Sequence, residues 1–223
     1  MLSENNNFEF WVRRVGWGLM SLMIVALCAY SAVYFLPGMP FSFRPEVYPG
    51  SSFTIFLLAH IGGAIIAALA GPPQFWSSFR SKHKKWHRLL GLSYLLGVCI
   101  AAPAALMISP ISKGGLSTHI GFALLAVLWA GATLIAYFEI SRKNWHAHQQ
   151  WMIRSFALTL AFVTLRLWLG TIALTGAPFD EVYQTVAWLC WVPNLLIAEL
   201  YIGWRASRSK DSARSENNAQ LQS

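Results

Sequence analysis

Residues Phe53–Ala70 read FTIFLLAHIGGAIIAALA, an apolar run with one ionisable residue, His60. A helix needs about 20 mostly apolar residues to cross the hydrocarbon core of a membrane. Comparable runs recur along the chain, because 56% of its 223 residues are hydrophobic and only 12% are charged. The sequence therefore predicts an all-α integral membrane protein with six transmembrane helices, at Trp17–Leu36, Phe53–Ala70, Leu89–Ile108, Thr118–Tyr137, Ile153–Leu174 and Tyr183–Trp204.

The basic residues predict how these helices are oriented. Most of them lie before the first run, between the second and third, between the fourth and fifth, and after the sixth, whereas the other connections hold only Arg44 and Lys113. Cytoplasmic loops are enriched in Lys and Arg, so we expect both termini in the cytoplasm and the chain in the bacterial inner (plasma) membrane. The same loops explain the net charge of +8, which therefore requires no nucleic acid.

The chain is predicted to form one membrane domain, residues 1–206, followed by a disordered cytoplasmic tail, residues 207–223, which is polar and lacks apolar periodicity. The first run is too long for the core of a cleaved signal peptide. Four prolines predict an irregular first outer connection over Pro37–Ser52. Pro72–Pro73 predict the end of the second helix, and Pro103 and Pro193–Asn194 predict kinks in the third and sixth.

Histidines recur about once per helix in the middle of the chain. His60, His87, His119 and His148 are separated by 27, 32 and 29 positions, and a membrane helix with a short connection takes about 30 residues. Since consecutive helices run in opposite directions, alternate histidines fall on the same side. We expect helices two to five to form a central four-helix bundle, with His60 and His119 toward the outer face and His87 and His148 toward the inner face.

The inner pair is ambiguous at one position. His146 and His148 are two residues apart, so on a helix they diverge and only one faces the bundle. His83 lies in the basic connection and is interpreted as an interfacial residue. Two imidazoles on opposite helices could together bind the iron of a haem. Arg88 and Arg154 lie near the inner pair and are candidate partners for the propionates of such a haem.

Three ionisable side chains within the predicted helices, those of His60, Arg166 and Glu199, each have more than one interpretation. An unpaired imidazole within hydrocarbon is costly, so His60 either ligates a metal cofactor or hydrogen-bonds a neighbouring helix. Arg166 either pairs with a haem propionate, a quinone headgroup or another anion, or extends to the outer interface. Glu199 either pairs with Arg154, relays protons, or lies at the inner interface.

Other kinds of site have little support in the sequence. It contains no phosphate-binding loop, dinucleotide fingerprint, nucleophile elbow or HExxH motif. Cys28, Cys99 and Cys190 lie in apolar runs without the spacing of a zinc site or a disulfide framework. Most of the 11 tryptophans lie at the ends of the runs, as in an aromatic belt.

Several motifs resemble a bacterial family of predicted six-helix membrane proteins of unknown function. They are Ala59-His60-Ile61-Gly62-Gly63, Gly71-Pro72-Pro73-Gln74-Phe75, His87-Arg88-Leu89-Leu90-Gly91-Leu92-Ser93-Tyr94, His119-Ile120-Gly121-Phe122, His148-Gln149-Gln150-Trp151-Met152-Ile153-Arg154-Ser155 and Thr164-Leu165-Arg166. The resemblance covers roughly residues 50–170. It implies a fold and supplies no activity.

A looser resemblance is to the di-haem cytochrome b family of ascorbate-reducible ferric reductases, which also carry one histidine on each of four central helices. It implies two b-type haems, with His60 and His119 as outer ligands and His87 and His148 (or His146) as inner ligands. The ascorbate-side lysine and the Ser-Leu-His-Ser-Trp pattern of that family are missing, because the fourth helix reads Leu116-Ser117-Thr118-His119-Ile120.

Two functional hypotheses follow. In the first, the protein is a transmembrane oxidoreductase that binds two haems b and carries electrons across the bilayer, from a quinol or another small donor to an acceptor. The haem partners are then His60, His87, His119, His148, Arg88, Arg154 and Arg166. In the second, it is a non-redox transporter or binding scaffold with a polar cavity lined by His60, His119 and Arg166.

Overall fold

The computed structural model describes the chain except for residues 1, 37–51, 177 and 221–223, and all regular structure in the described part is helical. The α-helices are α1 (Leu2–Ala32), α2 (Ser52–Gln74), α3 (Ser77–Lys82), α4 (Lys84–Ile108), α5 (Leu116–Ser141), α6 (Trp145–Thr159), α7 (Ala161–Ala173), α8 (Phe179–Leu189) and α9 (Val192–Gln220). Two short 3₁₀ helices, η1 (Val33–Phe35) and η2 (Ser109–Ile111), follow α1 and α4.

Six stretches are long and apolar enough to cross a membrane, and each contains most or all of one predicted run. This confirms the predicted fold class. The fifth and sixth spans each consist of two helices in series, α6–α7 and α8–α9. The break in the sixth span lies beside the kink predicted at Pro193–Asn194, whereas no break was predicted in the fifth span. The predicted first outer connection lies almost wholly outside the described residues.

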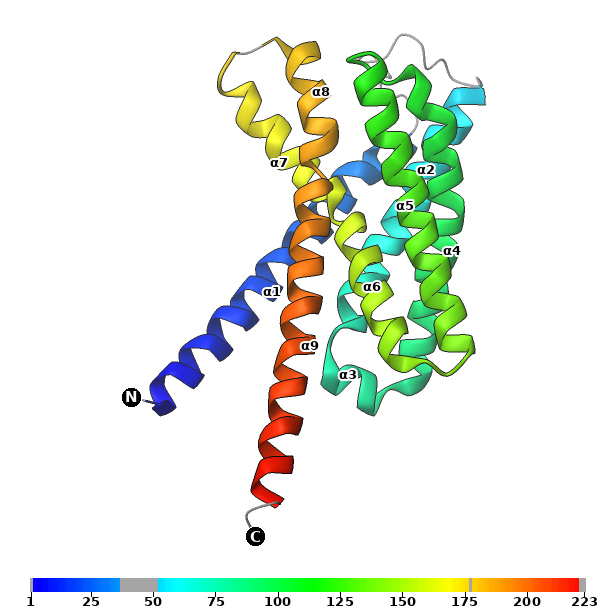
Figure 1. Cartoon of the computed structure of the whole chain (residues 1–223). Helices are drawn as coiled ribbons and strands as arrows, with labels where there is room; N and C mark the ends of the chain where they lie inside the picture. The colour runs from blue at the N-terminus through cyan, green and yellow to red at the C-terminus, as the bar shows by residue number, and fades with distance from the viewer. Residues whose placement is uncertain (1, 37–51, 177, 221–223) are drawn as a thin grey trace.

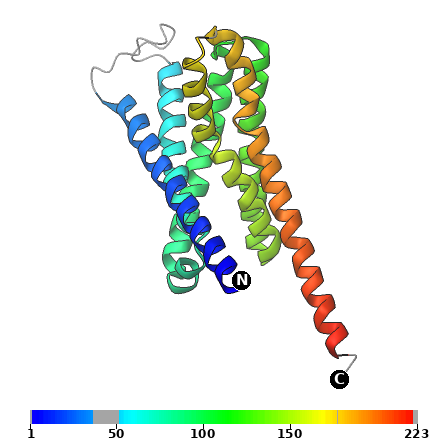
Figure 2. The same cartoon turned by 90° about the vertical axis from the view of Figure 1, so that its left-hand side faces the viewer.

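Four helices form a closed bundle. α2 packs along α4, α4 packs against α5, α5 packs against α6, and α6 returns to α2. This is the predicted central bundle, with α2 diagonal to α5 and α4 diagonal to α6. Both termini, α3 and the connection between α5 and α6 lie at one end (Figures 1 and 2), which we call the basic end after Arg80, Lys82, Lys84, Lys85, Arg142 and Lys143. That this end faces the cytoplasm stays a prediction.

Two glycines bring α2 and α4 into close contact. A Cβ atom built on Gly63 would lie 2.5 Å from the carbonyl oxygen of Gly97, and one on Gly97 would lie 2.6 Å from that of Gly63. Ala67 and Ala101 flank the contact and are fully buried. Small residues at an interface let membrane helices approach to backbone contact, so this pair fixes the position of the His60 backbone relative to α4.

A layer of buried hydroxyl groups crosses the middle of the bundle. The Tyr94 hydroxyl on α4 is 2.6 Å from Ser155 Oγ and 2.7 Å from Thr159 Oγ1, both on α6. From α5, Trp129 Nε1 donates to Thr159 Oγ1 at 2.9 Å, and Thr133 Oγ1 is 2.7 Å from Ser155 Oγ. Because every member has a partner, the layer joins three helices without leaving a buried polar group unpaired.

The helix breaks in the fifth and sixth spans lie side by side, and one side chain, that of Asn194, hydrogen-bonds to both. The fifth span is interrupted at Leu160, and the sixth at Cys190–Trp191, just before Pro193, which cannot donate a backbone hydrogen bond. Asn194 Nδ2 lies 3.3 Å from the carbonyl of Ala157 and 3.0 Å from that of Cys190. Thr164 Oγ1, 3.1 Å from the Asn194 amide, also donates to the Cys190 carbonyl. Side-chain donors thus satisfy carbonyls at both breaks, as helix breaks within a membrane require.

The prolines of the other spans lie within continuous helices. α2 runs through Pro72 and Pro73 and ends at Gln74, one residue beyond the predicted stop, and α4 runs through Pro103 to Ile108. At the basic end, α9 continues as a helix to Gln220. That residues 207–223 are disordered in solution stays a prediction.

Candidate functional site

A cavity of about 560 Å³ lies in the half of the molecule away from the basic end. It is partly open and is lined by the end of α1 with η1, by α2, by the end of α4 with η2, by α5, by both halves of the fifth span and by Tyr183 of α8. Its wall is largely aliphatic and aromatic, and its polar groups include Tyr30, Ser31, Tyr34, His60 and Arg166. Cavities of about 300–1,000 Å³ with a few convergent polar groups are typical of small-molecule sites.

His60 is held across the α2–α4 contact. Its Nδ1 atom lies 3.0 Å from the backbone carbonyl of Ala101 on α4. A carbonyl oxygen only accepts hydrogen bonds, so Nδ1 carries the hydrogen and Nε2 keeps its lone pair. The side chain lines the cavity, and Nε2 is therefore the atom available to a bound molecule. Both interpretations of His60 remain possible, because the interhelical hydrogen bond uses one ring nitrogen only.

Arg166 projects from α7 into the same cavity. Nη1 donates to the carbonyl of Phe162 on its own helix at 3.1 Å, and Nη2 donates to Ser31 Oγ on α1 at 3.0 Å. His60 lies close enough to interact with it electrostatically. Within the described part of the chain, no Asp or Glu forms a salt bridge with Arg166. A charge held in a membrane by neutral acceptors only is poorly compensated.

His119 does not line this cavity, contrary to the expectation that it would do so with His60 and Arg166. Its Nε2 atom lies 2.8 Å from the carbonyl of Ser112, just after η2. The connection from η2 to α5 folds back through Gly114 and Gly115, whose φ angles of 90° and 75° suit glycine. The turn brings the Ser112 carbonyl over the first turn of α5, and the imidazole satisfies it.

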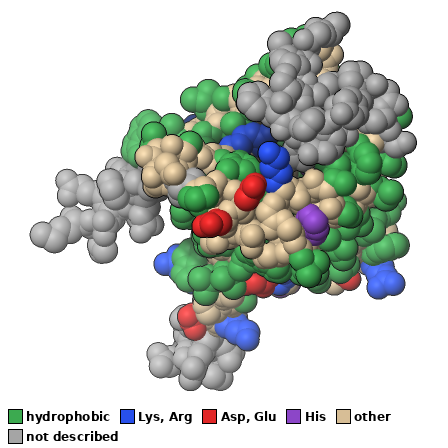
Figure 3. Space-filling model, turned by 90° about the horizontal axis from the view of Figure 1, so that it is seen from above, with side chains coloured by type: hydrophobic (Ala, Val, Ile, Leu, Met, Phe, Trp, Pro, Cys, Tyr) green, Lys and Arg blue, Asp and Glu red, His purple; other side chains and the backbone are tan. Residues whose placement is uncertain are grey.

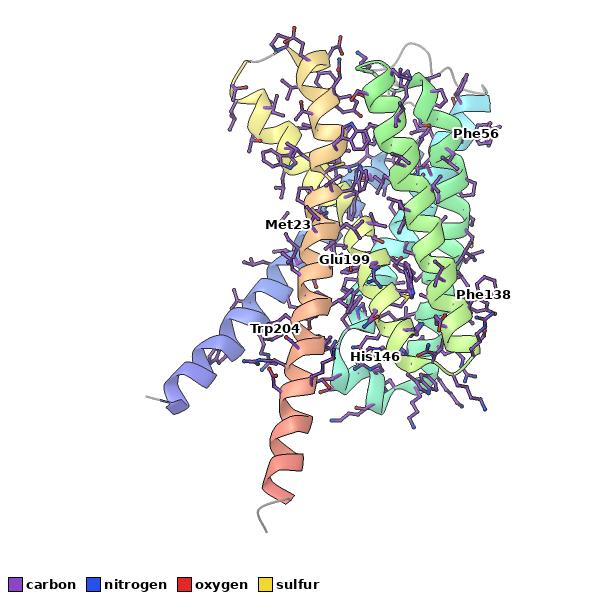
Figure 4. The ribbon with its side chains drawn as sticks, viewed as in Figure 1. Met23, Phe56, Phe138, His146, Glu199 and Trp204 are labelled. Carbon is purple, nitrogen blue, oxygen red and sulfur yellow. The ribbon has the colours of Figure 1, made fainter. Side chains whose placement is uncertain are left out.

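The inner histidines lie on diagonal helices at the basic end. His148 Nδ1 lies 2.7 Å from the carbonyl of Ala136 on α5, whereas His146 is exposed (Figure 4). Asn144 sets this orientation by capping α6, with its side chain 3.2 Å from the amide of Ala147. His87 interacts electrostatically with His148, and His87 Nδ1 is buried without a hydrogen-bond partner in the described structure. His148, not His146, is therefore the residue that faces the bundle.

Comparison with known proteins identifies the family. The model of a family described as a predicted membrane protein, DUF2306, matches residues 57–202. The chain belongs to the DUF2306 family. The match includes the four central histidines and Arg166, and it confirms the resemblance to a membrane protein family of unknown function. No curated protein and no solved structure matches the chain.

The two other predicted cations of this DUF2306 chain are not in the cavity. Arg88 is exposed at the basic end. Arg154 forms a bidentate ion pair with Glu199 on α9, with Nε–Oε1 and Nη2–Oε2 distances of 2.5 and 2.9 Å, and it also lies 4.6 Å from the Trp151 ring centroid. Figure 4 shows Glu199 on the side of α9 next to α6. The pairing of Arg154 with Glu199, one of the interpretations of Glu199, is thus the one found.

Part of the candidate site was not predicted. Ser31, Tyr30 and Tyr34 bring polar groups from the end of the first span, which had no assigned role. The available signal was three polar residues close together near the end of an apolar run. At the surface opposite the basic end, in the part not covered by grey atoms, hydrophobic side chains lie mainly around the edge, and a few basic, acidic and histidine side chains lie nearer the middle (Figure 3).

Proposed function

We propose that this protein is a membrane-embedded carrier or receptor that binds a small molecule in the cavity beside His60 and Arg166. The supporting observation is that one partly open, mostly apolar cavity is lined by both a guanidinium group and an imidazole nitrogen with a free lone pair. A bundle stabilised by packing alone has no need of a charged side chain at this depth, and intramembrane ionisable residues commonly mark a binding site or an ion path.

The position of the Arg166 guanidinium group also supports a role in binding. Arg166 is anchored at both Nη atoms, so its position is set before a ligand arrives. Such preorganisation lowers the entropic cost of binding.

The test is to fill the cavity and follow co-purifying small molecules. Ala64 lines the cavity on α2, and Ala64→Phe places a phenyl ring in the space a ligand would use. Ala29→Phe, at an exposed position of α1, is the matched control. Mass spectrometry of solvent extracts should find a compound bound to wild type and to Ala29→Phe, and depleted at least tenfold in Ala64→Phe. A compound retained equally by all three proteins would refute the assignment of the cavity.

Binding of b-type haem is a second candidate, and one specific observation favours it. In both His60 and His148, Nδ1 is bonded to a backbone carbonyl, which leaves Nε2 free. Metal-ligating histidines usually have this arrangement. If haem binds, His60 and His148 would be candidate ligands of the iron, and His87, with its buried unpaired Nδ1, would be the candidate partner of His148. Bound haem would supply a one-electron carrier in each half of the membrane.

The geometry of His119 counts against the outer haem as first expected. Its Nε2 atom is engaged by Ser112, and the side chain does not line the cavity, so an outer haem would have His60 as its one ligand facing the space. Arg166 is positioned to pair with a propionate there. An absorbance spectrum of protein expressed with ample haem tests this candidate, because His60→Ala should remove the outer haem and leave the inner one. Folded protein without a Soret band would exclude it.

A further inference from the structure

The positive charge of Arg166 in the cavity indicates the charge of the ligand. Arg166 is the only Lys, Arg, Asp or Glu among the described residues that line it. A guanidinium group has five N–H donors, and the described contacts of Arg166 are to two neutral oxygens, the Phe162 carbonyl and Ser31 Oγ. The remaining donors face a space with no protein carboxylate among the described residues. An anionic oxygen group on the ligand meets this charge, and carboxylate and phosphate match the guanidinium fork best.

The hydroxyl groups near Arg166 extend this polar region. Tyr30 and Tyr34 lie close enough to interact electrostatically with Arg166, and both line the cavity, as does Ser31. All three come from the last turn of α1 and from η1. Because hydroxyl groups donate to anionic oxygens as readily as they accept from guanidinium, this edge of the cavity is suited to a compact acidic headgroup.

The rest of the cavity has the opposite character. The wall includes Leu57, Ile61, Ile65, Leu125, Phe162 and Leu165, whose side chains offer no hydrogen bonds. A small polar anion such as acetate would leave this wall uncovered, whereas a hydrocarbon chain would fill it. The polar edge lies where α1 ends, and exposed apolar residues such as Leu22 and Val25 show that α1 is an outer helix of the molecule, facing lipid.

We propose that the ligand of this cavity is an anionic amphipath, with one acidic oxygen headgroup at Arg166 and a hydrocarbon chain along the apolar wall. The inference rests on the proposed function, since it names the class of molecule that the same site binds. The acid is held by charge-assisted hydrogen bonds from the guanidinium group and by the hydroxyl groups of α1 and η1. The headgroup comes from a free fatty acid or from a phosphate monoester lipid, which share this chemistry.

The experiment measures binding of radiolabelled palmitate and, in a separate series, of radiolabelled hexadecyl phosphate to the full-length chain in lipid nanodiscs, with unlabelled competitors. Palmitate and hexadecyl phosphate test the two sources of the headgroup. Hexadecanol has the chain without the charge, and acetate has the charge without the chain. We expect one or both acids to compete at least tenfold better than hexadecanol, and acetate not to compete. This series needs no variant, so it does not depend on the folding of a mutant.

Variants then locate the headgroup. Arg166→Gln should weaken palmitate binding about 10- to 100-fold, the range for losing hydrogen bonds to a charged group, and Arg166→Lys should retain part of it. Arg205→Gln is the matched control, because Arg205 lies on α9 outside the cavity, beside Tyr201. Ser31→Ala removes the hydroxyl that holds Nη2 and should weaken binding less than Arg166→Gln.

The outcomes separate this inference from the proposed function. If hexadecanol competes as well as palmitate, or if Arg166→Gln binds palmitate like wild type while Ala64→Phe does not, the cavity binds a ligand but the acidic headgroup is wrong. If palmitate, hexadecyl phosphate and hexadecanol all fail to bind while a co-purifying compound is lost from Ala64→Phe, the ligand belongs to another class. If Ala64→Phe changes no binding at all, both proposals fail.

Discussion

Replacement of Gly63 by alanine tests whether the α2–α4 contact supports the site. The new Cβ atom would lie 2.5 Å from the Gly97 carbonyl oxygen and 2.9 Å from the Ala101 amide nitrogen, whereas ordinary contacts begin at 3.4 Å. The two helices must therefore separate by about 0.9 Å, the difference between 3.4 and 2.5 Å. The 3.0 Å hydrogen bond from His60 to the Ala101 carbonyl crosses the same contact and is stretched beyond a useful length.

The cost follows from three contributions. Overpacking costs about 1–3 kcal/mol, loss of the hydrogen bond costs about 0.5–1.5 kcal/mol, and the better helix propensity of alanine returns about 0.5–1 kcal/mol. We expect Gly63→Ala to lower the free energy of unfolding by about 2 kcal/mol, a factor of about 30 in the folding equilibrium. The assay is reversible unfolding in mixed micelles titrated with a denaturing detergent and followed by far-ultraviolet circular dichroism.

Gly131→Ala is the matched control, because Gly131 also lies inside a membrane helix, α5, and a Cβ built there has no other atom within 4 Å. That variant should be as stable as wild type or slightly more stable. If Gly63→Ala proves as stable as Gly131→Ala, the close approach of α2 and α4 does not exist in the folded protein, and the orientation of His60 derived from it is wrong.

Three further substitutions test other contacts. Asn194→Ala removes the carboxamide that joins the two helix breaks, and the loss of its hydrogen bonds should cost about 2 kcal/mol in chemical unfolding. Tyr94→Phe deprives two buried hydroxyl groups of their shared partner and should cost about 1–2 kcal/mol in the same measurement. Glu199→Gln should cost less than about 1 kcal/mol, because the ion pair with Arg154 is partly exposed; a double-mutant cycle with Arg154→Gln measures the pair alone.

Each of these three predictions has a control variant or a result that would contradict it. Tyr201→Phe, at an exposed position of α9, should leave stability unchanged, so an equal loss in Tyr94→Phe and Tyr201→Phe would show that the hydroxyl layer contributes nothing. Asn194→Asp keeps an acceptor and removes the donor, and it should be at least as destabilising as Asn194→Ala. A coupling energy for Arg154 and Glu199 well above 1 kcal/mol would contradict the partial exposure of the pair.

The arrangement of the spans could be predicted because hydropathy and helix direction are properties of the chain itself. Six apolar runs with short connections leave few ways to pack, and the spacing of the histidines predicted His60 and His119 toward one face of the membrane and His87 and His148 toward the other. The sequence left His146 and His148 as alternatives, since both belong to the same turn. The cap at Asn144 decides between them, and its effect on helix phase requires the boundary of α6 to be known.

The helix breaks and the engagement of His119 could not be predicted in the same way. Pro193 indicated a kink in the sixth span, but no proline or glycine lies beside Leu160, and that break is matched by a carboxamide 34 positions away in the chain, at Asn194. His119 was expected in the cavity on the basis of depth alone. Its ring is instead bonded to the Ser112 carbonyl because the turn at Gly114–Gly115 folds the chain back, and turn geometry of this kind is not visible in hydropathy.

The side chain of Asn194 has a consequence for how the protein is made. Its amide group has partners on the preceding span, at Ala157 and Thr164, and at the break in its own span, at Cys190. The ribosome delivers the fifth span to the membrane before the sixth. The Ala157 carbonyl at the break in the fifth span therefore has no hydrogen bond from Asn194 at that stage. Synthesis of the sixth span supplies that donor, so the backbone of the fifth span is fully hydrogen-bonded only after the sixth has entered the membrane.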